Sequence, residues 1–312
     1  MSCTHRHAAS LLALALLAAP LAGQVGNDAS FDTSVARPAY PPGGGPRLLV
    51  DEAHNNLHTV AGRYASFAAV ATSDGFRVEP WTAPFAAGVL PAGSVLVIAN
   101  AAGAEQPQQP AFTPAEIGAV RGWVKAGGAL LLIADHAPFG AAAAELSAAF
   151  GVRMLDGHVR DAAHRATELP GPFFLEFTAD NGGLGEHPIV RGREGGEALR
   201  RVVTFGGQAL EASPGATVLL RLGTAAESVA TPDEPASPVT PVGGLAQAVA
   251  LEHGAGRVVV LGEAGIFGAQ HIAGEAAQRA GLPGELRFGM NHPGTDDRQL
   301  LLNTLHWLAR LL

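Results

Sequence analysis

Short apolar runs alternate with helical stretches over the first half of the chain. The runs at 47–51, 76–81, 94–100 and 129–135 are apolar almost throughout, which predicts buried strands. The segments 59–72, 113–126 and 141–150 have helical composition, and glycines follow each of them. Apolar strands that are each followed by a helix are typical of a parallel sheet covered on both faces. We therefore predict a three-layer α/β sandwich with a mostly parallel, doubly wound sheet.

The second half of the chain has a different pattern. We predict strands without intervening helices, at 173–177, 201–205, 217–222 and 246–252. The turn EHGAGR predicts a hairpin between 248–252 and 257–261. A Pro-rich exposed loop is expected at 231–242, and the leucine spacing in 296–312 predicts an amphipathic helix. These patterns indicate one α/β domain over 47–312 with a β-rich second half.

The N-terminal segment has the features of an export signal. Residues 1–23 combine Arg6, an apolar stretch and a small-residue exit at Ala22-Gly23. The alternative for this segment is a buried or anchoring helix. Later stretches of the chain fall short of the roughly 18 apolar residues of a membrane span. We therefore expect a signal peptide, a periplasmic or extracellular location and no membrane span. Residues 24–46 are rich in Pro and Gly, which predicts a flexible leader.

Composition narrows the functional classes. The chain of 312 residues is 47% apolar and 15% charged, with a net charge of −8. These values exclude a disordered tail protein and argue against a nucleic-acid partner or an anionic lipid surface. Cys3 is the only cysteine and lies in the predicted signal segment, so a mature chain would have no thiolate nucleophile. The G-x-S-x-G, P-loop, H-E-x-x-H and G-x-G-x-x-G motifs are absent from the expected positions.

Candidate functional residues follow the predicted strands. Ligands of open parallel sheets bind outside the carboxyl ends of the strands. Acids, amides and imidazoles stand at those ends here: Asp51, Glu52, His54, Asn100, Asp135, His136 and Glu263. If the strands are parallel neighbours, these groups gather at one edge.

Three interpretations of this group remain open. His54, Asp135, His136 and Glu263 form a set of oxygen and imidazole ligands for a divalent metal that activates water. Without metal, the same four residues are candidates for acid–base catalysis, with His54 and His136 the strongest. Alternatively, these side chains cap helices and satisfy buried polar groups. We assign four more polar residues to the rim of the ligand site: Asp51, Glu52, Asn100 and Asn291. Asn291 is included because it lies in the polar loop at 289–294, which leads into the last helix.

The other histidines are given smaller roles. His292 is interpreted as a loop residue, and His306 as a packing residue of the last helix. His158, His164 and His187 lie in weakly patterned segments and receive no role.

Several runs resemble a known group of proteins. DEAHNNLHTVAGRYASFA (51–68), TPAEIGAVRGWVKAGGALLLIADHAPFGAAAAEL (113–146), GLGEHPIVRGR (183–193), GRVVVLGEAGIF (256–267) and GMNHPGTDDRQLLLNTLHWLARLL (289–312) resemble a bacterial family of unknown function. That family is grouped with the class I glutamine amidotransferase-like (flavodoxin-like) superfamily. The resemblance covers roughly residues 47–312 and implies the fold, while it leaves the activity open.

The chain departs from the signature of that superfamily. Its nucleophilic Cys stands on a sharp turn after a central strand, and the matching segment here is 131–137. Asp135 and His136 occupy that place, so amide transfer through a cysteinyl thioester is excluded. Other members without the Cys are scaffolds or sugar-related proteins.

Three functional hypotheses follow. The first is an exported hydrolase, dependent on a metal or on acid–base chemistry. The second is a non-catalytic module of the bacterial envelope that binds a small polar molecule or a partner. The third is a scaffold subunit that uses the 231–242 loop and the 248–261 hairpin.

Overall fold

The computed structural model describes residues 25–232, 234–279 and 284–312, so the predicted signal segment lies outside the described residues. Its centre is a nine-stranded sheet. Five neighbouring strands run parallel in the order β3-β2-β4-β5-β15. They are β2 (Arg47–Asp51), β3 (Arg77–Trp81), β4 (Val95–Ala99), β5 (Ala129–Ile133) and β15 (Gly256–Leu261). The parallel sheet predicted from the apolar runs is confirmed.

Antiparallel strands extend the sheet beyond β15. They are β14 (Ala246–His253), β10 (Leu210–Ala212), β6 (Val152–Met154) and β11 (Thr217–Arg221). β14 pairs with β15 as the predicted hairpin and also pairs with β10 and β11. The sheet is therefore parallel from β3 to β15 and antiparallel from β14 outward.

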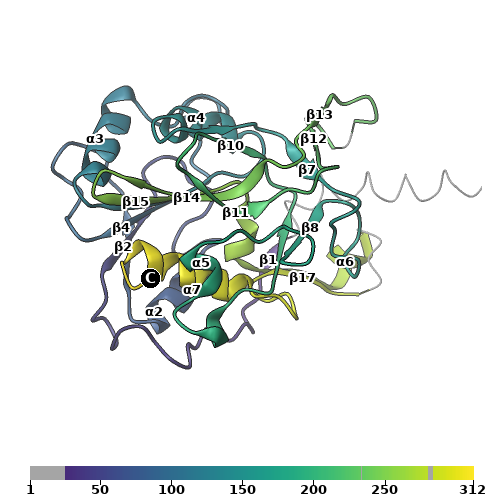
Figure 1. The fold of residues 1–312 in the computed structure, drawn as a ribbon, viewed down its shortest axis with the longest axis horizontal. Coiled ribbons are helices and arrows are strands. Elements are labelled where there is room, and N and C mark those ends of the chain that lie inside the picture. The colour runs from purple at the N-terminus through teal and green to yellow at the C-terminus, as the bar shows by residue number, and fades with distance from the viewer. Residues whose placement is uncertain (1–24, 233, 280–283) are drawn as a thin grey trace, which may run out of the picture.

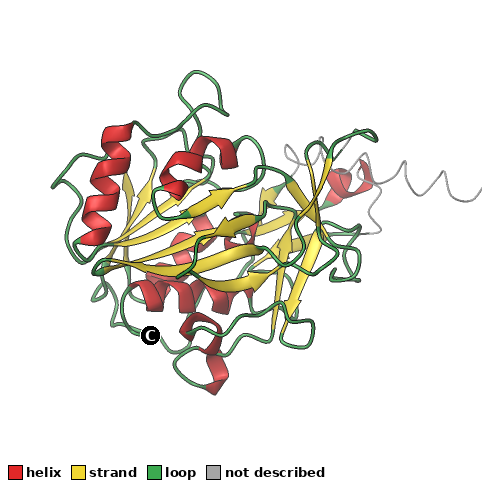
Figure 2. Ribbon diagram, turned by 45° about the horizontal axis from the view of Figure 1, so that its top comes forward, coloured by secondary structure: helices red, strands yellow, loops and turns green. Residues whose placement is uncertain are grey.

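Helices cover both faces of the sheet (Figures 1 and 2). α3 (Pro114–Lys125) and α4 (Phe139–Ala148) lie on one face, and α2 (Ala65–Ser73) and α7 (Asp297–Leu308) on the other. Successive residues of β5 enter opposite cores: Leu130 packs with Val120 of α3, and Leu131 packs with Leu301 of α7. This double burial explains why the central strands are apolar at every position.

Smaller elements complete the fold on the side of α6 (Gly274–Arg279), at the right of Figure 1. β7 (His158–Arg160), β12 (Glu227–Val229) and β13 (Val239–Pro241) form one sheet, and β8 (Phe174–Thr178) pairs with β9 (Arg201–Phe205). A third sheet contains β1 (Gly26–Asn27), β16 (Ala269–Ile272) and β17 (Leu286–Gly289). β13 lies inside the segment predicted as a Pro-rich loop, and its three residues are exposed. No described helix has the length and apolarity that a membrane crossing requires.

The structure differs from two expectations. Short helices lie between two of the later strands, where we expected none: α5 (Pro188–Arg191) and the 3₁₀ turn η1 (Gly195–Glu197) separate β8 from β9, and a second 3₁₀ turn, η2 (Gly265–Phe267), follows β15. The part of the expected flexible leader that the structure describes, 25–46, is packed against the domain. The Val35 N–H donates to Ser73 Oγ at 2.8 Å, and the Ala39 N–H donates to Asp74 Oδ1 at 2.8 Å. Composition alone could not reveal these contacts, because the partners lie more than thirty residues away.

Candidate functional site

The carboxyl ends of four parallel strands carry most of the predicted site residues. β2, β4, β5 and β15 are consecutive neighbours in the sheet, so the residues that follow them lie along one edge. Asp51 ends β2, Asn100 follows β4, Asp135 and His136 follow β5, and Glu263 follows β15. Their side chains divide into two groups with different surroundings.

The first group is an ion triad, which we call the His54 clamp: Asp51, His54 and Glu116. His54 Nδ1 lies 2.9 Å from both carboxylate oxygens of Asp51, and Nε2 lies 3.0 Å from Glu116 Oε1. The imidazole is buried between the rings of Phe85 and Phe112, each 4.7 Å away between centroids. Both ring nitrogens are therefore committed to carboxylates.

Electrostatics keeps the His54 clamp charged. Burial acts to lower the pKa of His54, but hydrogen bonds and charge from Asp51 and Glu116 together raise it. Burial likewise acts to raise the pKa of Glu116, yet hydrogen bonds from His54 and Thr113 bring it down to about 2. Glu116 and Thr113 also form the capping box of α3. The triad thus ties the loop after β2 to the start of α3.

The second group, which we call the rim pair, is His136 stacked on His158. Their ring centroids are 3.9 Å apart at an interplanar angle of 23°. Burial lowers the pKa of His158 to about 3, and the positive charge of His136 adds to that shift. His158 is therefore a neutral platform beneath His136 at neutral pH.

His136 itself is the open member of the site. Its Nδ1 lies 2.9 Å from the Ala137 carbonyl oxygen, a contact in which Nδ1 carries the proton. Nε2 lies 3.8 Å from Asp135 Oδ1, too far for a hydrogen bond but close enough for charge stabilisation. The side chain is 36% exposed. Its Nε2 lone pair is consequently available at the surface.

A buried acid stands behind Asp135. Glu263 is 2% exposed and accepts hydrogen bonds from Gly265 N at 2.6 Å and Ile266 N at 2.8 Å. Burial raises the pKa of Glu263 well above its ordinary range, and the negative charge of Asp135 raises it further. Tyr64, which donates to the Ala264 carbonyl at 3.0 Å, has its pKa raised by burial and by both of these acids. Asp135, Glu263 and Tyr64 are therefore electrostatic neighbours.

Buried amides hold the loop after β5 in place. Asn100 Oδ1 accepts from the Asp135 N–H at 2.8 Å, and the Asn100 backbone is in the left-handed region with φ 48°. Gln208 donates to the carbonyls of Ala134 and Asp135 at 2.8 and 3.0 Å, and its oxygen accepts from Asp156 N. Both amide side chains are buried, and their hydrogen bonds hold the backbone that carries Asp135 and His136.

Several important neighbours were missed by the sequence analysis: Tyr64, Glu116, Asp156, His158 and Gln208. Tyr64 and Glu116 lie in or beside helices, where they were interpreted as helix residues. Gln208 follows Gly206 and Gly207, which both have positive φ. A Gly-Gly pair after a strand is therefore the sequence signal that could have pointed to this turn and to Gln208.

Other expected members lie apart from this group. His54 is locked in its clamp, and no three His, Cys, Asp or Glu side chains of the described residues are arranged to hold a metal ion. The structure thus does not assemble His54, Asp135, His136 and Glu263 into one ligand set. Glu52 accepts the Val60 N–H at 2.7 Å. Asn291 donates to Asp28 and to the Gln270 carbonyl beside β16, rather than facing the rim pair.

Two further histidines are hydrogen-bonded elsewhere. His292 Nε2 lies 3.1 Å from Glu168. His306 is buried in α7 as expected, and its Nε2 also makes a hydrogen bond of 2.6 Å with Asp74.

Comparison with known proteins shows the fold. No protein-family model and no curated protein sequence matches the chain. The N-terminal domain of mmIFT52 superposes with a TM-score of 0.58 at 15% identity, over 84% of this chain and 97% of that one. A structure titled as a putative ThuA-like protein from Bacteroides uniformis ATCC 8492 also matches, with a TM-score of 0.44 and 15% identity, over 91% of this chain and 95% of that one. The likeness to the mmIFT52 domain concerns the fold and assigns no activity.

Proposed function

We propose that the protein is an exported hydrolase in which His136 acts as the general base. The carrying observation is the fixed tautomer of His136, because the Ala137 carbonyl holds the proton on Nδ1. Nε2 then takes a proton from a water molecule, and that water attacks the substrate. The substrate class implied by the polar rim is a small polar molecule.

Asp135 stabilises the charge that develops on His136. Its Oδ1 lies 3.8 Å from Nε2, so it attracts the imidazolium without occupying the lone pair. The neutral His158 ring supports the imidazole from one side. Asn100 and Gln208 hold the backbone of Asp135, which limits the movement of both groups.

A mutant series tests this role. Purified protein is screened against chromogenic esters, amides, glycosides and phosphate esters, and His136→Gln is compared with wild type. We expect kcat/KM to fall on the order of 100-fold, since a positioned base contributes about that much. His271→Gln is the matched control, because His271 is a partly exposed histidine that pairs with Glu285. Activity that survives in His136→Gln would exclude this residue as the base.

Export is tested separately. We expect the protein in the periplasm or medium to begin near residue 24, which mass spectrometry of the intact chain measures. A full-length chain retained in the cytoplasm would remove this part of the proposal.

A non-catalytic binding module is the second candidate function. Its support is that Glu263, Tyr64, Asn100 and Gln208 are buried and make their hydrogen bonds within the chain. In this case a ligand contacts the rim pair and Asp135 without turnover. A small polar ligand that raises the melting temperature of wild type, but not of His136→Gln, and that is recovered unchanged would favour binding.

A further inference from the structure

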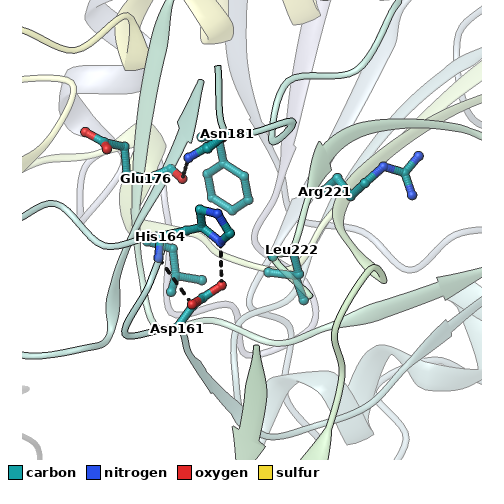
Figure 3. A pocket seen from close by; sticks show the side chains of 9 residues that line it. Asp161, His164, Glu176, Asn181, Arg221 and Leu222 are labelled. Carbon is teal, nitrogen blue, oxygen red and sulfur yellow. Dashed lines mark hydrogen bonds and ion pairs between the residues drawn. The ribbon is translucent and has the colours of Figure 1, made fainter. Parts of the chain in front are cut away.

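A second acid and imidazole pair lies outside the carboxyl edge of the sheet, after β7. Asp161 Oδ2 lies 3.0 Å from His164 Nδ1 (Figure 3). The carboxylate is buried, and its Oδ1 accepts the N–H groups of Ala163 at 2.9 Å and His164 at 3.2 Å. These backbone contacts fix the acid, and the acid in turn fixes the imidazole.

The contact also sets the state of His164. A carboxylate can only accept, so in neutral His164 the proton is on Nδ1 and the lone pair is on Nε2. Among the contacts of the described residues, none engages Nε2. The side chain is 30% exposed, so solvent reaches it. His164 thus has the arrangement of an imidazole base oriented by a buried acid.

His164 faces a small pocket. The pocket has a volume of about 10 Å³, which is room for about one water molecule. Leu175, Phe177 and Leu222 provide an apolar wall. In Figure 3 the side chains of Glu176 and Arg221 point away from the imidazole.

The other polar residues around the pocket are already bonded. Glu176 pairs with Arg201 at 2.6 Å, and Arg221 donates to the Gly244 carbonyl at 3.2 Å. The Asn181 amide donates to the Glu176 carbonyl, while its oxygen accepts from Thr178 N and Gly183 N. Within the described part of the chain, this leaves the His164 lone pair as the uncommitted basic group of the pocket.

Gly223 makes room for the pair. A Cβ at this position would lie 1.9 Å from His164 Nδ1 and 2.2 Å from Asp161 Oδ2. Any larger residue would therefore displace the imidazole or the carboxylate. The close approach of this glycine provides a test that leaves both functional groups in the chain.

We propose that Asp161 and His164 form a second acid–base centre, which activates a water molecule against small acyl esters. Nε2 takes a proton from the water while its oxygen bonds to the acyl carbon. The ester C–O bond then breaks, and the proton on Nε2 passes to the departing alkoxide, which gives one acid and one alcohol. No Ser, Thr or Cys is among the pocket residues, so water attacks directly. Because the pocket has room only for the water, the ester approaches the imidazole from its exposed side.

Hydrolysis of p-nitrophenyl acetate by the purified protein tests the proposal. We expect His164→Gln to lower kcat/KM on the order of 100-fold. His271→Gln is the matched control, because His271 is 32% exposed and lies 3.3 Å from a carboxylate, in Glu285. We expect this control to keep the rate of wild type, since it leaves Asp161 and His164 unchanged.

Gly223→Ala is the second variant. It retains His164 but moves it, so we expect a similar loss of rate at an unchanged circular dichroism spectrum. If Gly223→Ala does not fold, the comparison of His164→Gln with His271→Gln decides alone. Equal rates in those two variants, or a wild-type rate no faster than free imidazole, would overturn the proposal.

His136→Gln separates this centre from the proposed function. Its p-nitrophenyl acetate activity is measured beside that of His164→Gln, because the two centres would lose this activity in different variants. A loss confined to His136→Gln would assign the ester cleavage to the rim pair and overturn the proposal for His164. Loss in His164→Gln alone supports the second centre whether or not His136 is active elsewhere.

Labelling gives an independent measurement. The Nε2 lone pair of His164 attacks one carbonyl of diethyl pyrocarbonate, and ethyl carbonate leaves. We expect peptide mass spectrometry to find His164 labelled faster than His271, and Gly223→Ala to remove that difference. Slower labelling of His164 than of His271 would contradict an available Nε2.

Discussion

The His54 clamp and the rim pair begin from nearly the same local sequence and end in opposite states. Each histidine follows a buried parallel strand and an aspartate, at 51–54 and at 135–136. His54 gives both nitrogens to carboxylates and is buried between two phenylalanines. His136 gives one nitrogen to a carbonyl and leaves the other 3.8 Å from Asp135.

The difference shows what separates a structural histidine from a reactive one. An imidazole with two carboxylate partners is held charged and has no lone pair to offer. An imidazole with one carbonyl partner has its second nitrogen free to take a proton during the reaction. The number of partners decides the role, while position at a strand end only brings the residue to the edge.

The largest expected effect is on stability at the clamp. His54→Ala leaves the buried carboxylate of Asp51 and the partly buried carboxylate of Glu116 without their counter-charge, so we expect a loss of about 3–5 kcal/mol in the free energy of unfolding. Urea denaturation measures it. His136→Ala is the control and should cost less than about 1 kcal/mol, because the ring is partly exposed. Similar losses of unfolding free energy in both variants would contradict the distinction between a structural His54 and a reactive His136.

A smaller loss is expected at the acid behind the rim pair. Glu263→Gln keeps one oxygen acceptor but turns an NH₂ group toward a buried backbone N–H, of Gly265 or Ile266. An unpaired buried donor costs about 1–3 kcal/mol, which thermal denaturation will detect. Glu145→Gln, on the exposed side of α4, is the control and should leave the melting temperature unchanged.

Asn100 allows backbone strain to be separated from hydrogen bonding. Asn100→Gly and Asn100→Ala both remove the acceptor for the Asp135 N–H, but only alanine is strained at φ 48°. We expect the alanine variant to be about 1 kcal/mol less stable than the glycine variant. Both variants should lose activity at His136 to a similar extent. An activity loss restricted to the alanine variant would mean that the hydrogen bond to Asp135 is dispensable.

Lowering the pH tests how much the charge of Glu116 contributes to the stability of the His54 clamp. Hydrogen bonds from His54 and Thr113 overcome the opposing effect of burial and lower the pKa of folded Glu116 from 4.5 to about 2. The stability it contributes is therefore complete above pH 4.5 and is lost as the pH falls toward 2. We expect the melting temperatures of wild type and Glu116→Gln to converge over that range. A difference in melting temperature that stays constant with pH would mean that Glu116 stabilises the clamp by packing and not by its charge.

Much of the fold could be predicted because its signals are local. The four continuous apolar runs became β2 to β5, and the Thr113 to Glu116 spacing became the capping box of α3. The hairpin of β14 and β15 follows from the turn between them. The edge at which Asp51, Asn100, Asp135 and Glu263 gather also followed from the pattern, since parallel neighbours end at the same side.

The partners of those residues could not be predicted in the same way. Glu116 lies 62 positions after His54, and the contact of Gln208 with Asp135 spans 73 positions. The packing of the segment 25–46 was not predicted for the same reason, because its hydrogen-bond partners lie in α2 and just after the end of that helix.

The sequence by itself determined the strands, the main helices and the edge of the sheet where polar side chains end, because hydrophobic periodicity and capping act between residues close in the chain. Tertiary structure alone decided which imidazole keeps a free nitrogen, which acid is buried deeply enough for its pKa to rise, and where Asp161 and His164 meet Gly223. Those properties depend on desolvation and on hydrogen-bond partners supplied by distant segments, and only the packed chain brings these together.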